Sequence, residues 1–320
     1  MPSYNHEKYI SEAIESVFDQ DIKDLELIIV DDYSKDNSVE IIESHQNNDD
    51  RIRAIFHDKN MGIAKTLNDG IDAAEGKFIA FIASDDIWLE SKLEKQLSVL
   101  SSDEDLVVWS EGEIINESGI PTGVTFTQKY NASRRKKSGD IFEELLYGNY
   151  VFGSSLIAKK ENIEDIKFDE CLKYLNDYRF VVDLAKKYKY HFIQEPLAKY
   201  RIHGRNAILS DEKAWLQDEI IIGEYFLRRY GNELSSRLEA NLVFRIGTAY
   251  SRLGKTTIAK RFFWKAINSN LLCKDNLFYL RFALTHEDGL IGSFLANSYK
   301  TASSSLAQLG RKIRHKLEES

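Results

Sequence analysis

The first 110 residues alternate between short apolar runs and longer segments with helical periodicity. Apolar side chains at positions 10, 13, 14, 17 and 18 share one helical face, which predicts an amphipathic helix over residues 6–20. Strands are predicted at 25–30, 51–56, 77–83 and 106–109, of which the first and third are expected to be buried. Further helices are predicted at 36–45, 62–74 and 90–100. This alternation favours an α/β fold in which helices cover both faces of a mostly parallel sheet.

Two acidic pairs stand where predicted strands end. Asp31 and Asp32 follow the first of these strands, and Asp85 and Asp86 follow the third. Ligands of open α/β sheets bind beyond the carboxyl ends of the strands. We therefore place these four carboxylates ahead of the others in a chain with 51 acidic residues.

The second pair has the chemistry of a metal site. Two adjacent carboxylates are costly to bury unless they are paired, and a divalent cation would offset that cost. Oxygen ligands suit Mg²⁺ or Mn²⁺, and a metal bound to a diphosphate would neutralise the charge of a departing nucleotide. Taken alone, the pair is explained more simply by a helix cap, with Ser84 or Asp85 capping the helix that follows.

The first pair could recognise a nucleotide base. A carboxylate can accept a hydrogen bond from the N3–H group of uracil, and the ring of Tyr4 could stack on the base. The simpler alternatives are a turn at Asp31 and Asp32 and ordinary packing of Tyr4.

The second half of the chain has a mixed pattern and then becomes helical. Residues 141–147 and 175–187 are predicted to be helical, and 154–158 and 191–193 extended. From residue 211 onward the chain is predicted to be helical, with a soft domain boundary near Ser210. Residues 249–267 have the spacing of one tetratricopeptide repeat, but a stable solenoid needs about three repeats. We therefore expect a single helical hairpin there.

Composition and charge restrict the partners. A net charge of −8 argues against a general nucleic-acid binder. The two cysteines, Cys171 and Cys273, lie far apart and predict neither a disulfide framework nor a zinc site, which fits a reducing cytoplasm. No signal-peptide pattern is present, and the longest apolar runs are too short to span a membrane. Any membrane contact is therefore expected to be peripheral.

Two basic stretches, at residues 134–137 and 311–316, could meet anionic lipid or the diphosphate of a lipid-linked acceptor. A solvated charged surface explains both stretches more simply.

Several short motifs follow one another along residues 2–206. They are Pro2-Ser3-Tyr4-Asn5, Val30-Asp31-Asp32-Tyr33-Ser34, Asn60-Met61-Gly62 with Asn68 and Gly70, Ser84-Asp85-Asp86 with Trp88, Phe168-Asp169-Glu170, Asn176-Asp177 and Tyr200-Arg201-Ile202-His203. Each motif is weak by itself. The ordered set resembles the family 2 glycosyltransferases, a large inverting group with a GT-A fold.

The resemblance implies a role for each matching residue. Tyr4 would stack on uracil, Asp32 would hydrogen-bond it and Asp85 would contact the ribose. Asp86 would bind Mn²⁺ or Mg²⁺, and His203 would approach the metal or the diphosphate. Asp177 would be the general base that deprotonates the acceptor hydroxyl. The full set of implied donor-binding residues is Pro2, Tyr4, Asp32, Asn60, Gly62, Asn68 and Asp85.

The implied reaction is the inverting transfer of a sugar from a UDP-sugar to a hydroxyl group of a glycan or lipid-linked saccharide, as in surface polysaccharide biosynthesis. The GT-A domain would comprise residues 1–210, with a donor half at about 1–110 and an acceptor half at about 111–210, and a helical region at 211–320 would follow. The alternative is a non-catalytic nucleotide-binding or protein-docking module derived from the same fold.

Three positions depart from the family pattern. The family has an apolar strand before its first motif, whereas only Met1 precedes Pro2. The sequence therefore predicts an absent or drastically shortened strand, and predicts that an added apolar strand of about five residues would stabilise the fold. Ala83 stands where many relatives have the first Asp of a longer acidic motif. Asn176 replaces the usual Glu before the predicted base, so acceptor contacts are expected to differ.

Overall fold

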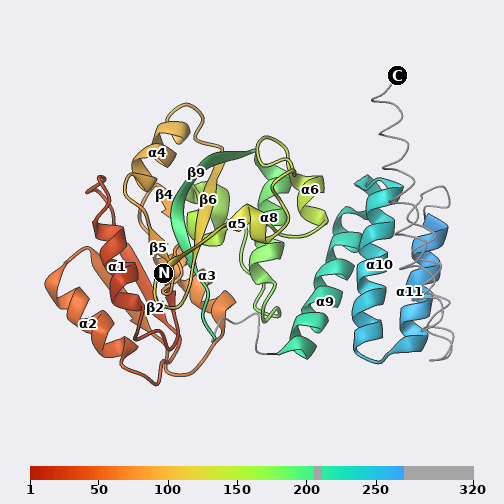
Figure 1. The fold of residues 1–320 in the computed structure, drawn as a ribbon, viewed down its shortest axis with the longest axis horizontal. Helices are drawn as coiled ribbons and strands as arrows, with labels where there is room; N and C mark the ends of the chain where they lie inside the picture. Colours follow the sequence, from red (N-terminus) through yellow and green to blue (C-terminus); the bar gives the residue numbers. More distant parts are fainter. Residues whose placement is uncertain (205–210, 270–320) are drawn as a thin grey trace, which may run out of the picture. The chain divides into compact units, whose positions relative to one another are not determined.

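The computed structural model describes residues 1–204 and 211–269. It divides into two compact units, Met1–Ile222 and a second unit that begins at Gly223. The predicted α/β architecture is present, and the helical region predicted for 211–320 is present as far as residue 269 (Figure 1). The predicted boundary near Ser210, Cys273 and the basic stretch at 311–316 lie outside the described residues.

The first sheet has three parallel strands. Its order is β1-β2-β3, and Pro2 of β1 pairs with Val30 while Leu27 of β2 pairs with Ile52. Helix α3 contacts β1 and β2, α2 contacts β3, and α1 contacts α2. The elements are β1 (Pro2–Ser3), α1 (Ile10–Phe18), β2 (Leu27–Asp31), α2 (Ser38–Asn48), β3 (Ile52–Phe56) and α3 (Ile63–Ala73).

The second sheet is mixed rather than parallel. Its order is β4-β8-β6-β9-β5, with β7 paired to β6, and only β6 and β9 run parallel. Figure 1 shows β9 beside β6. A buried strand has the same apolar pattern in either direction, so the sequence could not show this difference. The strands are β4 (Phe78–Ala80), β5 (Ile87–Trp88), β6 (Val107–Ile115), β7 (Pro121–Thr125), β8 (Ile157–Lys159) and β9 (Tyr190–Arg201).

Further helices complete the first unit, and the described part of the second unit consists of the end of α9 and a helical hairpin. The hairpin expected around Gly254 consists of α10 (Ser236–Arg252) and α11 (Thr256–Ser269). Gly247 allows the two helices to approach closely, because a Cβ at this position would lie 2.7 Å from the Phe263 ring. The remaining helices are α4 (Lys92–Leu100), α5 (Phe126–Lys129), α6 (Phe142–Leu146), α7 (Lys160–Glu164), α8 (Asn176–Lys187) and α9 (Glu212–Tyr230).

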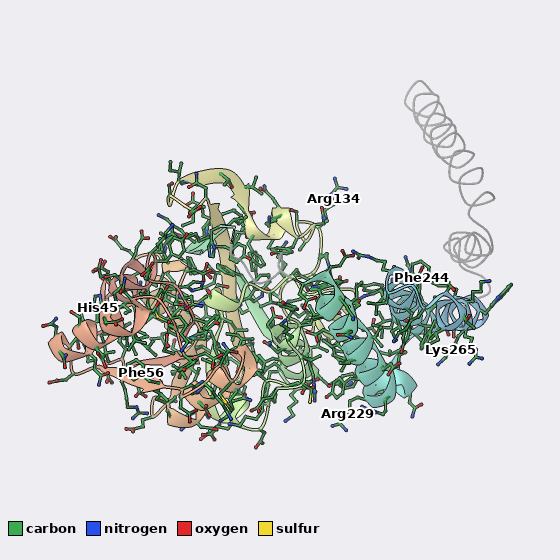
Figure 2. The ribbon with its side chains drawn as sticks, turned by 90° about the horizontal axis from the view of Figure 1, so that it is seen from below. His45, Phe56, Arg134, Arg229, Phe244 and Lys265 are labelled. Atoms are coloured by element: carbon green, nitrogen blue, oxygen red, sulfur yellow. The ribbon has the colours of Figure 1, made fainter. Side chains whose placement is uncertain are left out.

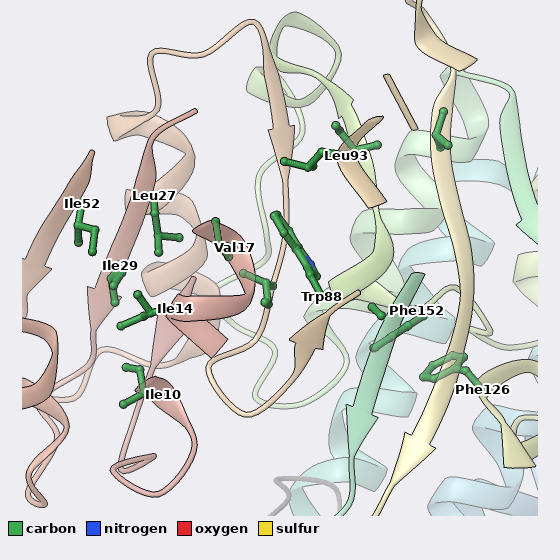
Figure 3. Close-up of a cluster of buried hydrophobic side chains, with 14 of the residues drawn as sticks. Ile10, Ile14, Val17, Leu27, Ile29, Ile52, Trp88, Leu93, Phe126 and Phe152 are labelled. Atoms are coloured by element: carbon green, nitrogen blue, oxygen red, sulfur yellow. The ribbon is translucent and has the colours of Figure 1, made fainter. Parts of the chain in front are cut away.

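The core of the first unit joins both sheets. Ile10, Ile14 and Val17 of α1 form the apolar face predicted from the sequence, and they pack beside Leu27 and Ile29 of β2 (Figure 3). Residues of the second sheet region, among them Trp88, Phe126 and Phe152, belong to the same cluster. Burying one such side chain stabilises the fold by roughly 1.5–3 kcal/mol. This shared core holds the strand ends described below in place.

A cavity of about 820 Å³ with a mostly apolar lining lies beside β1. Its walls include Leu27 and Ile28 of β2 and Phe78, Ile79 and Ala80 of β4. The strand expected to be shortened consists of two residues, and no strand among the described residues fills this space. The Met1 ammonium group is buried at the cavity wall, donates a hydrogen bond of 2.8 Å to the Ile28 carbonyl, and has its pKa lowered to about 5 by desolvation.

Candidate active site

A cleft of about 570 Å³ opens beyond the carboxyl ends of β1, β2 and β4. Three of the ten predicted site residues, Asn68, Asp86 and His203, do not line it. The seven that do are Pro2, Tyr4, Asp32, Asn60, Gly62, Asp85 and Asp177. The fold therefore brings the start of the chain, three loops and the first turn of α8 around one cavity.

Asp32 anchors the loop that follows β3. Its Oδ1 accepts hydrogen bonds from the Met61 backbone N–H at 2.6 Å and lies 2.8 Å from His57 Nδ1, and its Oδ2 accepts from the Gly62 N–H at 2.8 Å. Gly62 has φ +88°, in the region that favours glycine, and this conformation aims its N–H at the carboxylate. Tyr4 follows β1 at the cleft wall and is 46% exposed.

Asn68 connects two parts of the chain. It lies in α3, donates to the Phe168 carbonyl at 3.0 Å and to Glu170 at 3.2 Å, and accepts from the Phe168 N–H at 2.9 Å. These bonds fix the 168–170 segment against α3. The structure thus gives Asn68 a positioning contact, and its predicted donor-binding role stays a prediction.

The Asp85 carboxylate lies close to the rings of two histidines. Its Oδ2 lies 3.0 Å from His203 Nε2 and 4.0 Å from His6 Nε2, and the three ligand atoms lie within 4.8 Å of one another. His6 Nδ1 is 2.8 Å from the Ser84 hydroxyl, which orients its ring, and Tyr9 stacks on His203. Burial opposes ionisation of Asp85, but the His203 hydrogen bond and the charge of His6 outweigh it and lower its pKa.

Asp86 is directed into the protein interior. It is 2% exposed, and its carboxylate accepts from the Ser154 hydroxyl and, at 3.0 Å, from the Arg201 backbone N–H. Burial, together with the neighbouring charge of Asp85, raises its pKa well above the usual range. Both oxygens therefore have protein partners, and Asp86 is not part of the His–Asp–His group.

Arg201 contacts both Asp85 and Asp86. Its side chain donates to the Asp85 carbonyl at 2.9 Å and to Glu12 at 2.6 Å, while its backbone N–H bonds Asp86. The side chain is 3% exposed and also lies over the Tyr9 ring. These contacts tie the end of β9 to α1 and to the acidic loop.

Asp177 stands in the first turn of α8. It is exposed to the cleft, accepts from Asn149 at 3.0 Å and accepts from the Tyr178 N–H at 2.6 Å. Desolvation raises its pKa to about 6 despite both hydrogen bonds. A carboxylate with a pKa near 6 is ionised at neutral pH and is a stronger base than an ordinary Asp.

Sequence reasoning missed several residues of this site. His6, Ser154 and Asn149 were given no role, and Arg201 was noted only as part of a motif. His6 directly follows the first motif, but its partners Asp85 and His203 are far away in sequence, so no local spacing could have identified the group. Only the fold brings these three residues together.

The basic stretch at 134–137 is partly engaged in internal contacts. Arg135 pairs with Glu144 and lies over the Tyr150 ring, and Lys137 donates to the Ser133 carbonyl. Arg134 projects from the surface (Figure 2). A lipid or diphosphate contact of this stretch stays a prediction. Within the described ranges, no helix is both long and apolar enough to cross a membrane.

Comparison with known proteins identifies the class. The model of glycosyl transferase family 2 matches residues 1–159. An uncharacterised glycosyltransferase of Methanocaldococcus jannaschii is 35% identical over 214 residues, which cover 66% of this chain and 72% of the relative. A glycosyltransferase of Bacillus subtilis, TuaG, described as acting in teichuronic acid biosynthesis, is 40% identical over 99 residues, or 31% of this chain and 39% of TuaG.

Solved structures agree with the sequence comparisons. The Staphylococcus aureus protein TarS, in complex with UDP-GlcNAc, superposes with a TM-score of 0.63 at 20% identity, over 84% of this chain and 79% of that one. The fold is therefore the GT-A fold of glycosyltransferases, as the motifs predicted. The chain belongs to glycosyl transferase family 2 and is a glycosyltransferase.

Proposed function

We propose that this glycosyltransferase moves a sugar from a UDP-sugar to a hydroxyl group of a glycan or lipid-linked saccharide, with inversion at the anomeric carbon. The observation that carries the proposal is a single cleft with three chemically distinct parts. Tyr4 and Asp32 line it together with Asp85 of the His–Asp–His group and with Asp177, whose pKa is raised to about 6.

The base would bind beside Tyr4 and Asp32. The exposed Tyr4 ring offers a stacking surface. A carboxylate oxygen can accept two hydrogen bonds, and Asp32 Oδ2 accepts one, from Gly62, so it retains room for the N3–H of uracil. The TarS complex with UDP-GlcNAc supports uridine as the nucleotide.

A divalent cation would bind at His6, Asp85 and His203. One carboxylate and two imidazoles within 4.8 Å of one another form a suitable ligand set, and the imidazoles favour Mn²⁺ over Mg²⁺. Bound there, the ion would neutralise the diphosphate charge that develops on the leaving nucleotide. This proposal moves the metal from Asp86 to Asp85 and leaves Asp86 as a buried support for the acidic loop.

Asp177 would take the proton from the acceptor. The acceptor oxygen attacks the anomeric carbon as the bond from that carbon to the diphosphate breaks, UDP leaves with the electron pair, and the hydroxyl proton passes to the Asp177 carboxylate. Positioning both substrates in one cleft supplies much of the rate enhancement in such a displacement.

We assign the reaction to residues 1–210, with donor contacts mainly in residues 1–110 and the base in 111–210. The similarity to TuaG supports a step in surface polysaccharide synthesis. The alternative of a non-catalytic docking module is disfavoured by family membership and by the presence of Asp85 and Asp177 in one cleft.

A nucleotide-sugar screen tests the proposed donor. Melting temperatures would be measured with UDP-, GDP- and dTDP-sugars, with and without Mn²⁺. A ligand that binds only the native state raises stability as its concentration increases. We expect stabilisation by UDP-sugars that is larger with Mn²⁺. Stabilisation by GDP- or dTDP-sugars alone would contradict the uridine assignment.

The metal assignment predicts different effects of two neighbouring substitutions. Asp85→Asn is expected to weaken Mn²⁺-dependent UDP binding at least about tenfold, because loss of a charged metal ligand of this kind costs more than about 1.4 kcal/mol. Asp86→Asn is expected to change it by less than about threefold, because both Asp86 oxygens have protein partners. Titration calorimetry of UDP at fixed Mn²⁺ measures the affinity of both variants. A larger loss of affinity for Asp86→Asn than for Asp85→Asn would indicate that Asp86 is the metal ligand.

A further inference from the structure

Asn176 has a hydrogen-bond donor without a partner inside the protein. It is the first residue of α8, is 3% exposed, and lines the cleft next to Asp177. Its buried Nδ2 makes no hydrogen bond to any of the described residues. Buried polar groups in folded proteins are nearly always hydrogen-bonded, so an orphan at a ligand cleft calls for an explanation. An acceptor atom on the substrate would supply the missing partner.

Part of the wall of the cleft that Asn176 lines is apolar. Phe168 and Phe180 stack with ring centroids 4.0 Å apart, and Phe81 meets both edge to face at 5.8–5.9 Å. All three rings line the same cleft as Asn176, together with Val181. A group that fits this wall carries both a hydrogen-bond acceptor and an apolar substituent.

The charges that line the cleft further restrict which substrate group could accept a hydrogen bond from Asn176. Three carboxylates, those of Asp32, Asp85 and Asp177, line the cleft against one lysine, Lys173, so a substrate carboxylate would meet mostly like charges. A sugar hydroxyl could accept from Nδ2, but it would carry no methyl group to place against the rings. An acetamido group does both, because its carbonyl oxygen is an acceptor and its methyl group is apolar.

We propose, on the basis of the proposed function, that the donor is a UDP-sugar bearing an acetamido group and that Asn176 recognises the carbonyl of this group. One continuous cleft contains both Tyr4 and Asn176, so a single ligand can reach the base site and the amide together. The amide also distinguishes this chain from a relative with Glu at the position, because a carboxylate cannot donate a hydrogen bond.

The test compares UDP-glucose with two donors that each differ from it at one carbon of the sugar. Affinities of UDP-GlcNAc, UDP-glucose and UDP-glucuronic acid would be measured by calorimetry with Mn²⁺ for the wild type, Asn176→Ala and Asn176→Asp. Asn176→Asp keeps the side-chain volume but removes the donor. The matched control is Asn162→Ala, which removes a buried asparagine, 6% exposed, that does not line the cleft.

We expect the wild type and the Asn162 control to bind UDP-GlcNAc about tenfold more tightly than UDP-glucose. Both Asn176 variants are expected to reduce this ratio below about threefold while UDP-glucose affinity stays within about twofold in Asn176→Ala. A ratio that is near one in the wild type, or unaffected by both variants, would overturn this inference alone. Tighter binding of UDP-glucuronic acid than of UDP-GlcNAc would mean that the Asn176 amide binds a carboxylate, and this result would also overturn the inference. Binding of none of the three donors would overturn the proposed function as well.

Discussion

Asp177→Asn is expected to lower turnover by about 10²- to 10⁴-fold while UDP-sugar affinity stays within about twofold. The amide cannot accept the acceptor proton, whereas the residues proposed to bind the nucleotide and metal are untouched. Initial rates of UDP release with acceptor, together with calorimetry of the donor, measure both quantities. Asp183→Asn on the same helix is the control, because Asp183 does not line the cleft. A loss of less than tenfold for Asp177→Asn would mean that another residue is the base.

The pKa of Asp177 gives this prediction a pH signature. Because the base must be ionised, we expect wild-type turnover to fall about tenfold per pH unit below a pH of about 6, the value to which its pKa is raised. The residual activity of Asp177→Asn should not show this fall below a pH of about 6. A wild-type rate that is flat from pH 7 to pH 5 would contradict the assignment.

Asp177→Asn is also expected to raise the melting temperature at neutral pH. An unfolded Asp has a pKa near 3.9, so between about pH 4 and pH 6 the folded chain binds more protons at Asp177 than the unfolded chain does. The free energy of unfolding therefore decreases as pH rises through this window, and the cost of the ionised carboxylate is fully present above it. Thermal melts should show a gain for Asp177→Asn at pH 7.5 that disappears near pH 4.

Joining an apolar segment of about five residues ahead of Met1 is expected to stabilise the first unit markedly. The cavity of about 820 Å³ lies between β2 and β4, and the register of Pro2 with Val30 would align the added residues alongside Leu27 and Ile28. Each added aliphatic side chain that becomes buried contributes roughly 1.5–3 kcal/mol before its ordering cost. A net gain of about 2 kcal/mol would raise Tm by roughly 4–8 °C for a unit of this size.

The buried Met1 ammonium provides an independent readout. Its pKa is lowered to about 5 in the fold, against about 8 in an unfolded chain. Between these values the unfolded chain binds more protons, so this group makes the free energy of unfolding increase as pH rises from 5 to 8. An extended chain loses this contribution because the buried amine becomes an amide.

A matched extension of five Gly and Ser residues separates burial from charge removal. It also converts the ammonium to an amide, but it has no apolar side chains for the cavity. We expect the apolar extension to have the higher Tm of the two and to bind UDP more tightly than the original chain, because Tyr4 directly follows β1. Equal melting temperatures for all three chains would show that no added strand occupies the cavity.

Much of the fold was determined by local sequence patterns. The apolar face of α1 and the strands β2, β3 and β6 are specified by patterns that act within a few residues. The ordered motifs identified the family, and seven of the ten predicted site residues line one cleft because strand ends converge at one edge of a sheet. These features depend on neighbours in sequence or on the general geometry of parallel strands.

Tertiary structure decided what depends on distant partners. Asp85 and Asp86 are adjacent and chemically identical, yet one meets His6 and His203 while the other accepts from Ser154 and the Arg201 backbone. The direction of the strands in the second sheet is likewise set by pairing rather than by pattern. The raised pKa of Asp177 depends on how much water the assembled cleft excludes. Burial and long-range contacts exist only after folding. The sequence alone therefore identified Asp85, Asp86 and Asp177, but it could not find their partners His6 and Ser154.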